Sequence, residues 1–323
     1  MTTARLCAPA YELGECADPV TELPELLADP KAAAELTDPA AGFHTYRWSD
    51  AGITELMALA VHRTLAGARI PGSEIDMVLL ATDSLPRDRT AHRDVAELLD
   101  ETGVDRATVM ALGLMDCATA MVAVGTAASY VRDGTARNVL VVTGDLADLS
   151  TGGSRIVAGG AAIASDAAAS VLVSADAPGL PVRAMAHHSA PELNLGGGPQ
   201  QQLLSRIRAH RELFARLAAR GGSDLAGVRS VLPSNFARNV LEVYLSDVGL
   251  GGDKLALGDV GRIAHCLGSD PLINLANRLA QEADGADGAV GGDTLVLFGA
   301  GVSHLAAVLL GAEPLPRRTE ASR

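Results

Sequence analysis

Three residues of types that can act as nucleophile, base and acid stand at Cys117, His265 and Asp270. Cys117 follows a short apolar segment and precedes a run of small residues, a pattern typical of a strand that turns abruptly into a tightly packed helix. A thiol at such a turn lies at the positive end of the helix dipole, which favours thiolate and can later stabilise an oxyanion. We therefore interpret Cys117 as a candidate covalent nucleophile. A small buried core residue is the alternative interpretation.

His265 is the histidine best placed to serve this cysteine. It lies in the segment IAHCLGSDPLINL, just before a predicted helix, and Asp270 follows five residues later. A turn through Gly268 can return the carboxylate to the imidazole, and the three side chains would then work as a Cys–His–Asp triad. The alternatives are a core histidine for His265 and, because Pro271 follows, a helix N-cap for Asp270.

A glycine turn over residues 299–301 follows the last predicted strand. Glycines let a backbone approach a bound carbonyl closely, so we expect the N–H groups of Ala300 and Gly301 to complete an oxyanion hole with that of Cys117. A phosphate cradle is the competing interpretation, but no GK[ST] or GxGxxG motif supports it. His304 follows the turn and is a candidate substrate-binding residue.

An internal near-repeat supplies the elements that position these residues. Each half has a strand, an amphipathic helix, a second helix after a turn, and an apolar strand. In the first half these are 74–84, 93–104, 117–134 and 138–145, and in the second half 228–235, 236–250, 270–285 and 293–301. The pattern predicts an α/β fold of two duplicated halves, 1–175 with the cysteine and 176–323 with the His/Asp segment, built on parallel sheets covered by helices. A pseudo-two-fold axis between the halves would bring His265 to face Cys117.

Composition excludes several classes of protein. The 323 residues include 26 Lys and Arg against 39 Asp and Glu, for a formal net charge of −13, without the basic cluster of a nucleic-acid binder. No apolar run has the length of a membrane span, and no secretory signal opens the chain, so we expect a cytoplasmic protein. The cysteines show neither metal-site nor disulfide-framework spacing; they stand at positions 7, 16, 117 and 266.

Two polar segments are the natural places for an entrance over the site: 86–93 and 186–202. In the first, Arg87, Arg89 and Arg93 could meet a phosphopantetheine phosphate or a carrier protein. Solvated surface charges are the alternative.

Taken together, the segments resemble the thiolase superfamily and, within it, the ketoacyl synthase III-like enzymes. The resemblance spans nearly the whole chain and is carried by IDMVLLATDS, LMDCATAMVAVGTAASYVRDGTARNVLVVTGD, SDAAASVLVSAD, VLPSNFARNV and FGAGVSHLAAVLL. It implies a five-layered αβαβα fold, a homodimer, and an acyl group taken from acyl-CoA or acyl carrier protein onto Cys117 with no further cofactor. The turn at 299–301 matches the family's oxyanion loop.

The departures from this family matter more than the matches. Chain-extending members have a histidine in an HQAN-type motif, where this chain has Ser234 followed by Asn235. Their GNTSA-type asparagine segment is replaced by AHCLGSDP, which carries His265 and Asp270. This pattern resembles a branch from antibiotic biosynthesis in which a Cys–His–Asp triad transfers acyl groups to an alcohol or amine. We expect Ser234, Asn235 and His304 to contact substrate.

The resulting prediction is an acyltransferase acting on a small secondary-metabolite acceptor. A condensing enzyme that joins a starter unit to malonyl carrier protein is the main alternative, and a catalytically inactive partner subunit of the same fold is a third.

Overall fold

A nine-stranded mixed sheet is the main feature of the computed structural model, which describes residues 2–85, 90–222, 225–283 and 294–311. The strands follow the order β11, β12, β13, β10, β1, β9, β6, β4, β5. Their bounds are β1 (Arg5–Leu13), β4 (Met77–Ala81), β5 (Thr108–Leu112), β6 (Asn138–Asp145), β9 (Ala167–Ser174), β10 (Leu180–Ser189), β11 (Val228–Pro233), β12 (Thr294–Ala300) and β13 (His304–Leu310). Two smaller sheets pair β2 (Cys16–Pro19) with β3 (Thr45–Trp48) and β7 (Ile156–Val157) with β8 (Ala162–Ile163).

The large sheet repeats one arrangement of strands twice. In the first set, β4 pairs parallel with β6. Strand β6 then pairs antiparallel with β9, and β9 pairs antiparallel with β1. In the same way β11 pairs parallel with β12, and β13 and β10 follow antiparallel. Short β1–β10 pairing joins the two sets. In the first set β4 also pairs parallel with β5. In the second set the corresponding contact of β11 is an isolated parallel bridge between Val231 and Leu255.

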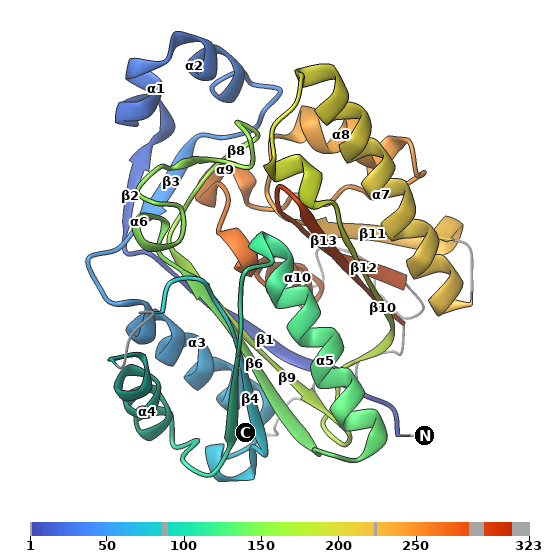
Figure 1. The fold of residues 1–323 in the computed structure, drawn as a ribbon. Coiled ribbons are helices and arrows are strands. Elements are labelled where there is room, and N and C mark those ends of the chain that lie inside the picture. The colour runs from blue at the N-terminus through green and yellow to red at the C-terminus, as the bar shows by residue number, and fades with distance from the viewer. Residues whose placement is uncertain (1, 86–89, 223–224, 284–293, 312–323) are drawn as a thin grey trace.

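Helices separate and cover the two sets of strands (Figure 1). The six longest are α3 (Ile53–Ala68), α4 (Thr90–Thr102), α5 (Thr119–Asp133), α7 (Pro199–Gly221), α8 (Arg238–Ser246) and α10 (Asp270–Ala283). Helix α3 packs on β1, β6 and β9 and against α4, whereas α7 packs on β10 and β13 and against α8. Helices α5 and α10 contact strands of both sets, so they form the middle of five layers.

Shorter helical segments complete the chain. The α-helices are α1 (Pro24–Ala28), α2 (Pro30–Leu36), α6 (Ala147–Ser150) and α9 (Val260–Ile263). The 3₁₀ turns are η1 (Val20–Glu22), η2 (Gly72–Glu74), η3 (Asp116–Ala118), η4 (Pro191–Asn194), η5 (Leu225–Gly227), η6 (Gly252–Lys254) and η7 (Leu267–Ser269). Two of them, η3 and η7, lie directly before the central helices α5 and α10. Among the residues that the structure describes, no helix is both long and apolar enough to cross a membrane.

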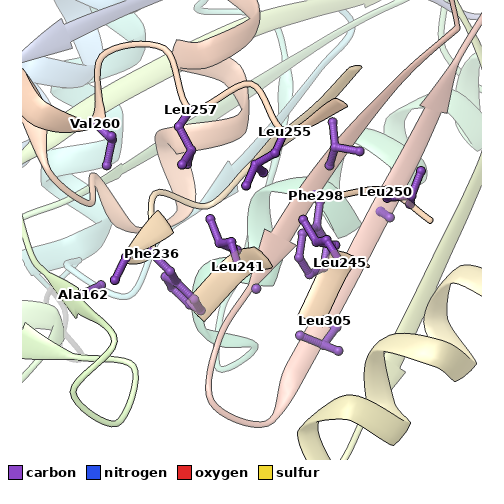
Figure 2. Close-up of a cluster of buried hydrophobic side chains, with 14 of the residues drawn as sticks. Ala162, Phe236, Leu241, Leu245, Leu250, Leu255, Leu257, Val260, Phe298 and Leu305 are labelled. Carbon is purple, nitrogen blue, oxygen red and sulfur yellow. The ribbon is translucent and has the colours of Figure 1, made fainter. Parts of the chain in front are cut away.

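Small residues let the middle layer lie close to strands on both sides. The face of α5 carries alanines that are fully buried, among them Ala120, Ala123 and Ala127. At Gly125 an added Cβ would lie 2.5 Å from the Met185 side chain, so this position requires glycine. Larger side chains fill the outer layer, and Figure 2 shows this cluster between β12, β13 and α8. The small residues of α5 hold the start of that helix, and therefore Cys117, in one position.

The structure confirms the α/β class and the five layers, and corrects the prediction of parallel sheets. Strands β9, β13, β1 and β10 run antiparallel to their neighbours. All residues of β6 and β9 are buried, and burial on both faces gives the same continuous apolar run in either direction. The boundary between 175 and 176 stays a prediction.

Candidate active site

The structure places Cys117, His265 and Asp270 in one hydrogen-bonded row. Sγ of Cys117 lies 3.1 Å from Nε2 of His265, and Nδ1 of His265 lies 2.5 Å from Oδ2 of Asp270. Cys117 belongs to η3 before α5, and Asp270 is the first residue of α10. The side chains of His265 and Asp270 are both 0 % exposed, so a charge that forms on the imidazole is shielded from water.

Backbone bonds on both sides hold His265 in place. Its N–H donates to the carbonyl of Ile163 at 2.9 Å, and its carbonyl accepts from the N–H of Ser165 at 2.8 Å. The ring meets the Phe236 ring edge-on, with centroids 5.2 Å apart. Ala264 before it has φ 49° and ψ −137°, a strained conformation for a residue with a Cβ. With Nδ1–H donated to Asp270, the lone pair of Nε2 faces the thiol.

The Asp270 carboxylate is fully engaged in orienting this histidine. Besides the ring, Oδ2 accepts from the backbone N–H of Asn235 at 2.6 Å, and Oδ1 accepts from the N–H of Cys266 at 2.8 Å. These bonds are to other segments of the chain and not to N–H groups of α10. The arrangement therefore favours an orienting acid over the N-cap alternative.

Asn235 holds the framework and does not line the cavity, which differs from the prediction that it contacts substrate. Its Nδ2 donates to the carbonyl of Ala264 at 2.9 Å, and its Oδ1 accepts from Nδ2 of Asn274 at 2.9 Å. Asn274 also donates to the carbonyl of Pro233 at 2.9 Å. Both asparagines are buried, and together they fix the loop that carries the strained residue beside His265.

Two of the three expected oxyanion donors are occupied in this structure. The N–H of Ala300 donates to Oγ of Ser234 at 3.0 Å, and that of Gly301 donates to the carbonyl of His304 at 2.9 Å. Both N–H groups, at the turn between β12 and β13, therefore already have acceptors within the protein. The N–H of Cys117 lies in the first turn of η3, where helix geometry leaves donors without an intrahelical acceptor.

The glycine turn lies close to the segment that carries the cysteine. A Cβ at Gly299 would lie 2.7 Å from the carbonyl oxygen of Cys117, and one at Gly301 would lie 2.1 Å from Cβ of Asp116. Asp116 itself has φ 50°, and its Oδ2 accepts from the N–H of Ser303 at 3.3 Å. The turn thus fixes the position of η3 by steric contact.

Ser234 and His304 also lie outside the expected substrate contacts. Ser234 is 0 % exposed, and its hydroxyl oxygen accepts from the N–H of Ala300. Nδ1 of His304 lies 3.0 Å from Oγ of Ser189. Neither residue lines the cavity that contains the nucleophile. In this structure Ser234 bonds the turn and His304 pairs with the end of β10, and a substrate contact of either residue stays a prediction.

A cavity of about 330 Å³ opens beside the triad, within the usual size of a small-molecule site. Three carboxylates line it together with Cys117 and His265, and the sequence analysis did not single them out: they belong to Asp83, Asp116 and Asp145. The remaining lining residues are Ser150, Thr151, Ile156, Val157, Ala158, Leu267, Gly268, Gly301 and Val302. Asp83 and Asp145 follow or end the parallel strands β4 and β6, whose carboxyl ends meet at one edge. That convergence was the available signal.

The electrostatics of the site disfavour the thiolate form of Cys117. Burial raises the pKa of Cys117 well above its ordinary value, and nearby carboxylates raise it further. These carboxylates are, in decreasing order of effect, Asp116, Asp270, Asp145 and Asp83. Acidic neighbours and burial therefore act against the helix dipole, which favours the thiolate. Nε2 of His265, 3.1 Å from the thiol, is the group placed to take the proton as the sulfur attacks.

Asp145 is an unusual acid in this cavity. Burial raises its pKa to about 7, although its Oδ1 accepts from the hydroxyl of Thr82 at 3.1 Å, the N–H of Asp83 at 2.9 Å and the hydroxyl of Ser84 at 3.0 Å. A carboxyl poised near neutrality beside a nucleophile is characteristic of functional sites.

The two expected entrance segments have different outcomes. Arg87 and Arg89 lie outside the described residues, and Arg93 forms ion pairs with Asp94 and Glu97. The segment 186–202 completes β10, forms η4 and begins α7, and none of it lines the cavity. In the described part of the chain, no group of three or more His, Cys, Asp or Glu side chains is arranged to hold a metal ion.

Comparison with known proteins adds a structural frame to this site. No protein-family model and no curated protein sequence matches the chain. Among solved structures, ChlB3, an acyltransferase, superposes with a TM-score of 0.78 over 97% of this chain and 98% of that one, at 18% identity. The chain has the thiolase-like fold. Other structures with this fold extend the likeness. The 3-oxoacyl-[acyl-carrier-protein] synthase III of Aquifex aeolicus VF5 gives a TM-score of 0.75 at 18% identity, covering 95% of this chain and 99% of that one.

Cerulenin-bound OleA of Xanthomonas campestris gives a TM-score of 0.76 at 17% identity, covering 96% of this chain and 98% of that one. Within the thiolase-like fold, this chain's own contacts are the evidence for the chemistry of its site.

Proposed function

We propose that the protein is an acyltransferase that carries the acyl group on Cys117 and passes it to a hydroxyl or amine. One observation carries the proposal: Cys117, His265 and Asp270 form an unbroken hydrogen-bonded row at the wall of a cavity. Such a row supplies a nucleophile, one general base and an orienting acid, which acyl transfer requires. Its fold likeness to an acyltransferase, ChlB3, supports the proposal.

The first half-reaction loads the cysteine. Nε2 of His265 takes the thiol proton while Sγ of Cys117 attacks the carbonyl carbon of an acyl thioester. The new S–C bond gives a tetrahedral oxyanion, towards which the N–H of Cys117 is the best placed donor of the predicted set. When the intermediate collapses, the bond to the donor's sulfur breaks and the imidazolium returns its proton to that leaving thiol.

The second half-reaction uses the same proton path in reverse. His265 takes a proton from the acceptor hydroxyl or amine as its oxygen or nitrogen attacks the acyl carbon. The S–C bond to Cys117 breaks, and the sulfur recovers the proton. Asp270 stabilises the imidazolium in both halves, and positioned acid–base catalysis of this kind contributes about 10²–10⁴-fold.

Condensation with malonyl thioester is the alternative, and fold likeness to a 3-oxoacyl-[acyl-carrier-protein] synthase III favours it. Two observations weigh against it. Ser234 stands where the resembled condensing enzymes have a histidine, and its hydroxyl is bonded to the N–H of Ala300. A malonyl carboxylate would also have to enter a cavity lined by three carboxylates, which repel it.

The donor and the assembly belong to the same proposal. The resemblance implies acyl-CoA or acyl carrier protein as donor, a secondary-metabolite acceptor, a homodimer and a cytoplasmic setting. No bound cofactor is needed for the two half-reactions, because proton and acyl group both move through side chains of the chain.

Intact-protein mass spectrometry after mixing with a panel of acyl thioesters tests the proposal. The expected result is an acyl adduct on the wild-type protein and none on Cys117→Ala, with Cys16→Ala as the matched control that still loads. An adduct of equal yield on Cys117→Ala would contradict the assignment of the nucleophile.

A further inference from the structure

We propose that the acyl donor or the acceptor carries a protonated, non-reacting amine that binds in the cavity beside Asp145, Asp83 and Asp116. This inference rests on the proposed acyl transfer and adds the chemical class of the substrate. It follows from how the carboxylates of the cavity are partnered, and from the fact that no Lys or Arg is among its described lining residues.

Asp145 presents an oxygen without a donor to the site. Its side chain is more than nine-tenths buried, with 7 % exposed. The three described donors, from Thr82, Asp83 and Ser84, all go to Oδ1. No described residue donates to Oδ2, which would lie 4.0 Å from a Cβ built on the cavity-lining Gly268. Oδ2 belongs to a largely buried side chain that lines the cavity, so it is available to accept from a donor group of a ligand.

The other two carboxylates are held in the same incomplete way. Oδ1 of Asp83 accepts from the N–H of Leu114 at 2.9 Å, and Oδ2 of Asp116 accepts from the N–H of Ser303 at 3.3 Å. Each therefore has one oxygen fixed by the backbone. The fixed oxygens orient the carboxylates. Asp83 is half-buried and Asp116 is exposed, and no described residue donates to the second oxygen of either.

The other buried carboxylates among the described residues have a cation or an imidazole as partner. Asp166 is paired with Arg155 at 3.2 Å, and Asp270 with His265. Among the described residues that line the cavity there is neither Lys nor Arg, and its one histidine is committed to Asp270. A positive charge that the described lining residues do not provide can come from a ligand.

An ammonium group fits these acceptors better than other ligand classes do. It offers three N–H donors and a full positive charge, whereas a hydroxyl would leave the negative charges uncompensated. An anionic acyl group would add repulsion. The described residues offer no group arranged for a metal ion. An ammonium here also opposes the carboxylates that disfavour the Cys117 thiolate, so binding and activation would be coupled.

Thioesters matched in shape test the donor as the source of the amine. β-Alanyl and butyryl pantetheine differ only in an ammonium in place of a methyl group, and malonyl pantetheine carries an anion instead. Acylation of Cys117 is followed by intact mass. If the donor carries the amine, β-alanyl loads at least about tenfold faster than butyryl, and malonyl loads slowest.

Matched alcohols test the acceptor as the source. Enzyme preloaded with butyryl is offered 3-aminopropan-1-ol or butan-1-ol, and loss of the adduct is measured against the acid-denatured acyl protein as background. If the acceptor carries the amine, the aminoalcohol clears the adduct at least about tenfold faster.

Charge-removing variants show where the amine binds. Asp145→Asn removes the charge and keeps an oxygen that can accept from Thr82 and Ser84. Asp83→Asn removes the charge at a half-buried position and keeps an oxygen for the N–H of Leu114. Either change should reduce the ammonium preference by at least about threefold. Asp148→Asn, on the exposed side of α6, is the matched control and should leave it unchanged. Unfolding in urea confirms that each variant is folded.

The outcomes separate this inference from the proposed function. Equal or faster reaction of both methyl analogues, with Cys117 still acylated, would overturn the amine inference and leave the acyltransferase intact. A preference that survives both Asp variants would overturn the assigned binding position. No adduct with any thioester would overturn the proposed function and the inference that depends on it.

Discussion

The backbone N–H of Asn235 lies 2.6 Å from Oδ2 of Asp270, on the oxygen that also receives the His265 ring. The segment after β11 thus holds the acid of the triad from outside its own helix. In the resembled condensing enzymes this segment carries a histidine that meets the substrate; here it serves as a scaffold for the base. Two parts of the chain that depart from the family pattern, Ser234–Asn235 and His265–Asp270, are therefore in direct contact.

We predict that Asn235→Ala lowers stability and turnover without weakening substrate binding. The change removes the partners of the Ala264 carbonyl and of one Asn274 N–H, and each buried unsatisfied group costs about 1–3 kcal/mol. Urea unfolding and steady-state kinetics measure both effects, with kcat reduced and KM for the acceptor unchanged. The exposed Asn239→Ala is the control. A raised KM with unchanged kcat would instead return Asn235 to the substrate-binding residues.

Asp270→Asn should retain the fold and lose most of the activity. The amide can still accept from the N–H of Cys266, but it no longer stabilises an imidazolium on His265. His265 is then poorly oriented, and no carboxylate stabilises its imidazolium form. For these reasons kcat/KM should fall by about 10²–10⁴-fold. Stopped assays with the best acyl thioester measure this loss, with the exposed Asp253→Asn for comparison. Activity within a factor of about two of wild type would rule out an essential orienting acid.

Alkylation of Cys117 should rise steadily through alkaline pH. Burial and the neighbouring carboxylates raise its pKa above the ordinary value of 9.0, so thiolate is scarce at pH 7 and its fraction is still increasing at pH 9. The iodoacetamide rate, measured from pH 6 to 10 with Cys117→Ala as background, should follow this course without a plateau near neutrality. A rate that is already maximal at pH 6 would indicate a preformed thiolate–imidazolium pair.

The stability of Asp145→Asn relative to wild type should improve as pH rises. Burial raises the pKa of Asp145 from 3.8 to about 7, so the unfolded chain loses this proton first. Between about pH 4 and 7 the folded wild type holds a proton on Asp145 that the unfolded chain has lost. Its unfolding free energy therefore falls as pH increases, whereas asparagine does not titrate and adds no such dependence. We would measure the unfolding free energy of both proteins in urea at pH 5 and pH 8. The value for Asp145→Asn minus that for the wild type should increase by more than about 1 kcal/mol from pH 5 to pH 8. Parallel changes in both proteins would contradict a raised pKa.

The sequence could predict that Cys117 and His265 lie close together, because equivalent loops of a duplicated fold are expected to meet near a pseudo-axis and both residues stand on such loops. The catalytic role of the row stays a prediction. Strand β6 was predicted with the bounds that the structure shows, 138–145, since its apolar run is uninterrupted. Strand direction could not be predicted, because a strand buried on both faces reads alike in either direction.

The fate of single backbone groups also lay beyond the sequence. Whether the N–H groups of Ala300 and Gly301 are available depends on the turn between β12 and β13 and on a hydroxyl 66 residues away, that of Ser234. The roles of Asp83 and Asp145 depend on two strand ends that lie side by side only in the folded sheet. Such partners become visible only when the three-dimensional arrangement is known.

The most direct test of the central claim is a single turnover of the acylated enzyme. Cys117 is loaded with a labelled acyl group, the donor is removed, and the protein is offered hydroxyl and amine acceptors or carboxyl-labelled malonyl thioester. Acyl transfer predicts that an alcohol or amine clears the adduct intact, that His265→Ala slows this clearance, and that no labelled carbon dioxide is released. Clearance by malonyl thioester alone, with stoichiometric carbon dioxide, would contradict the account and assign the site to carbon–carbon condensation.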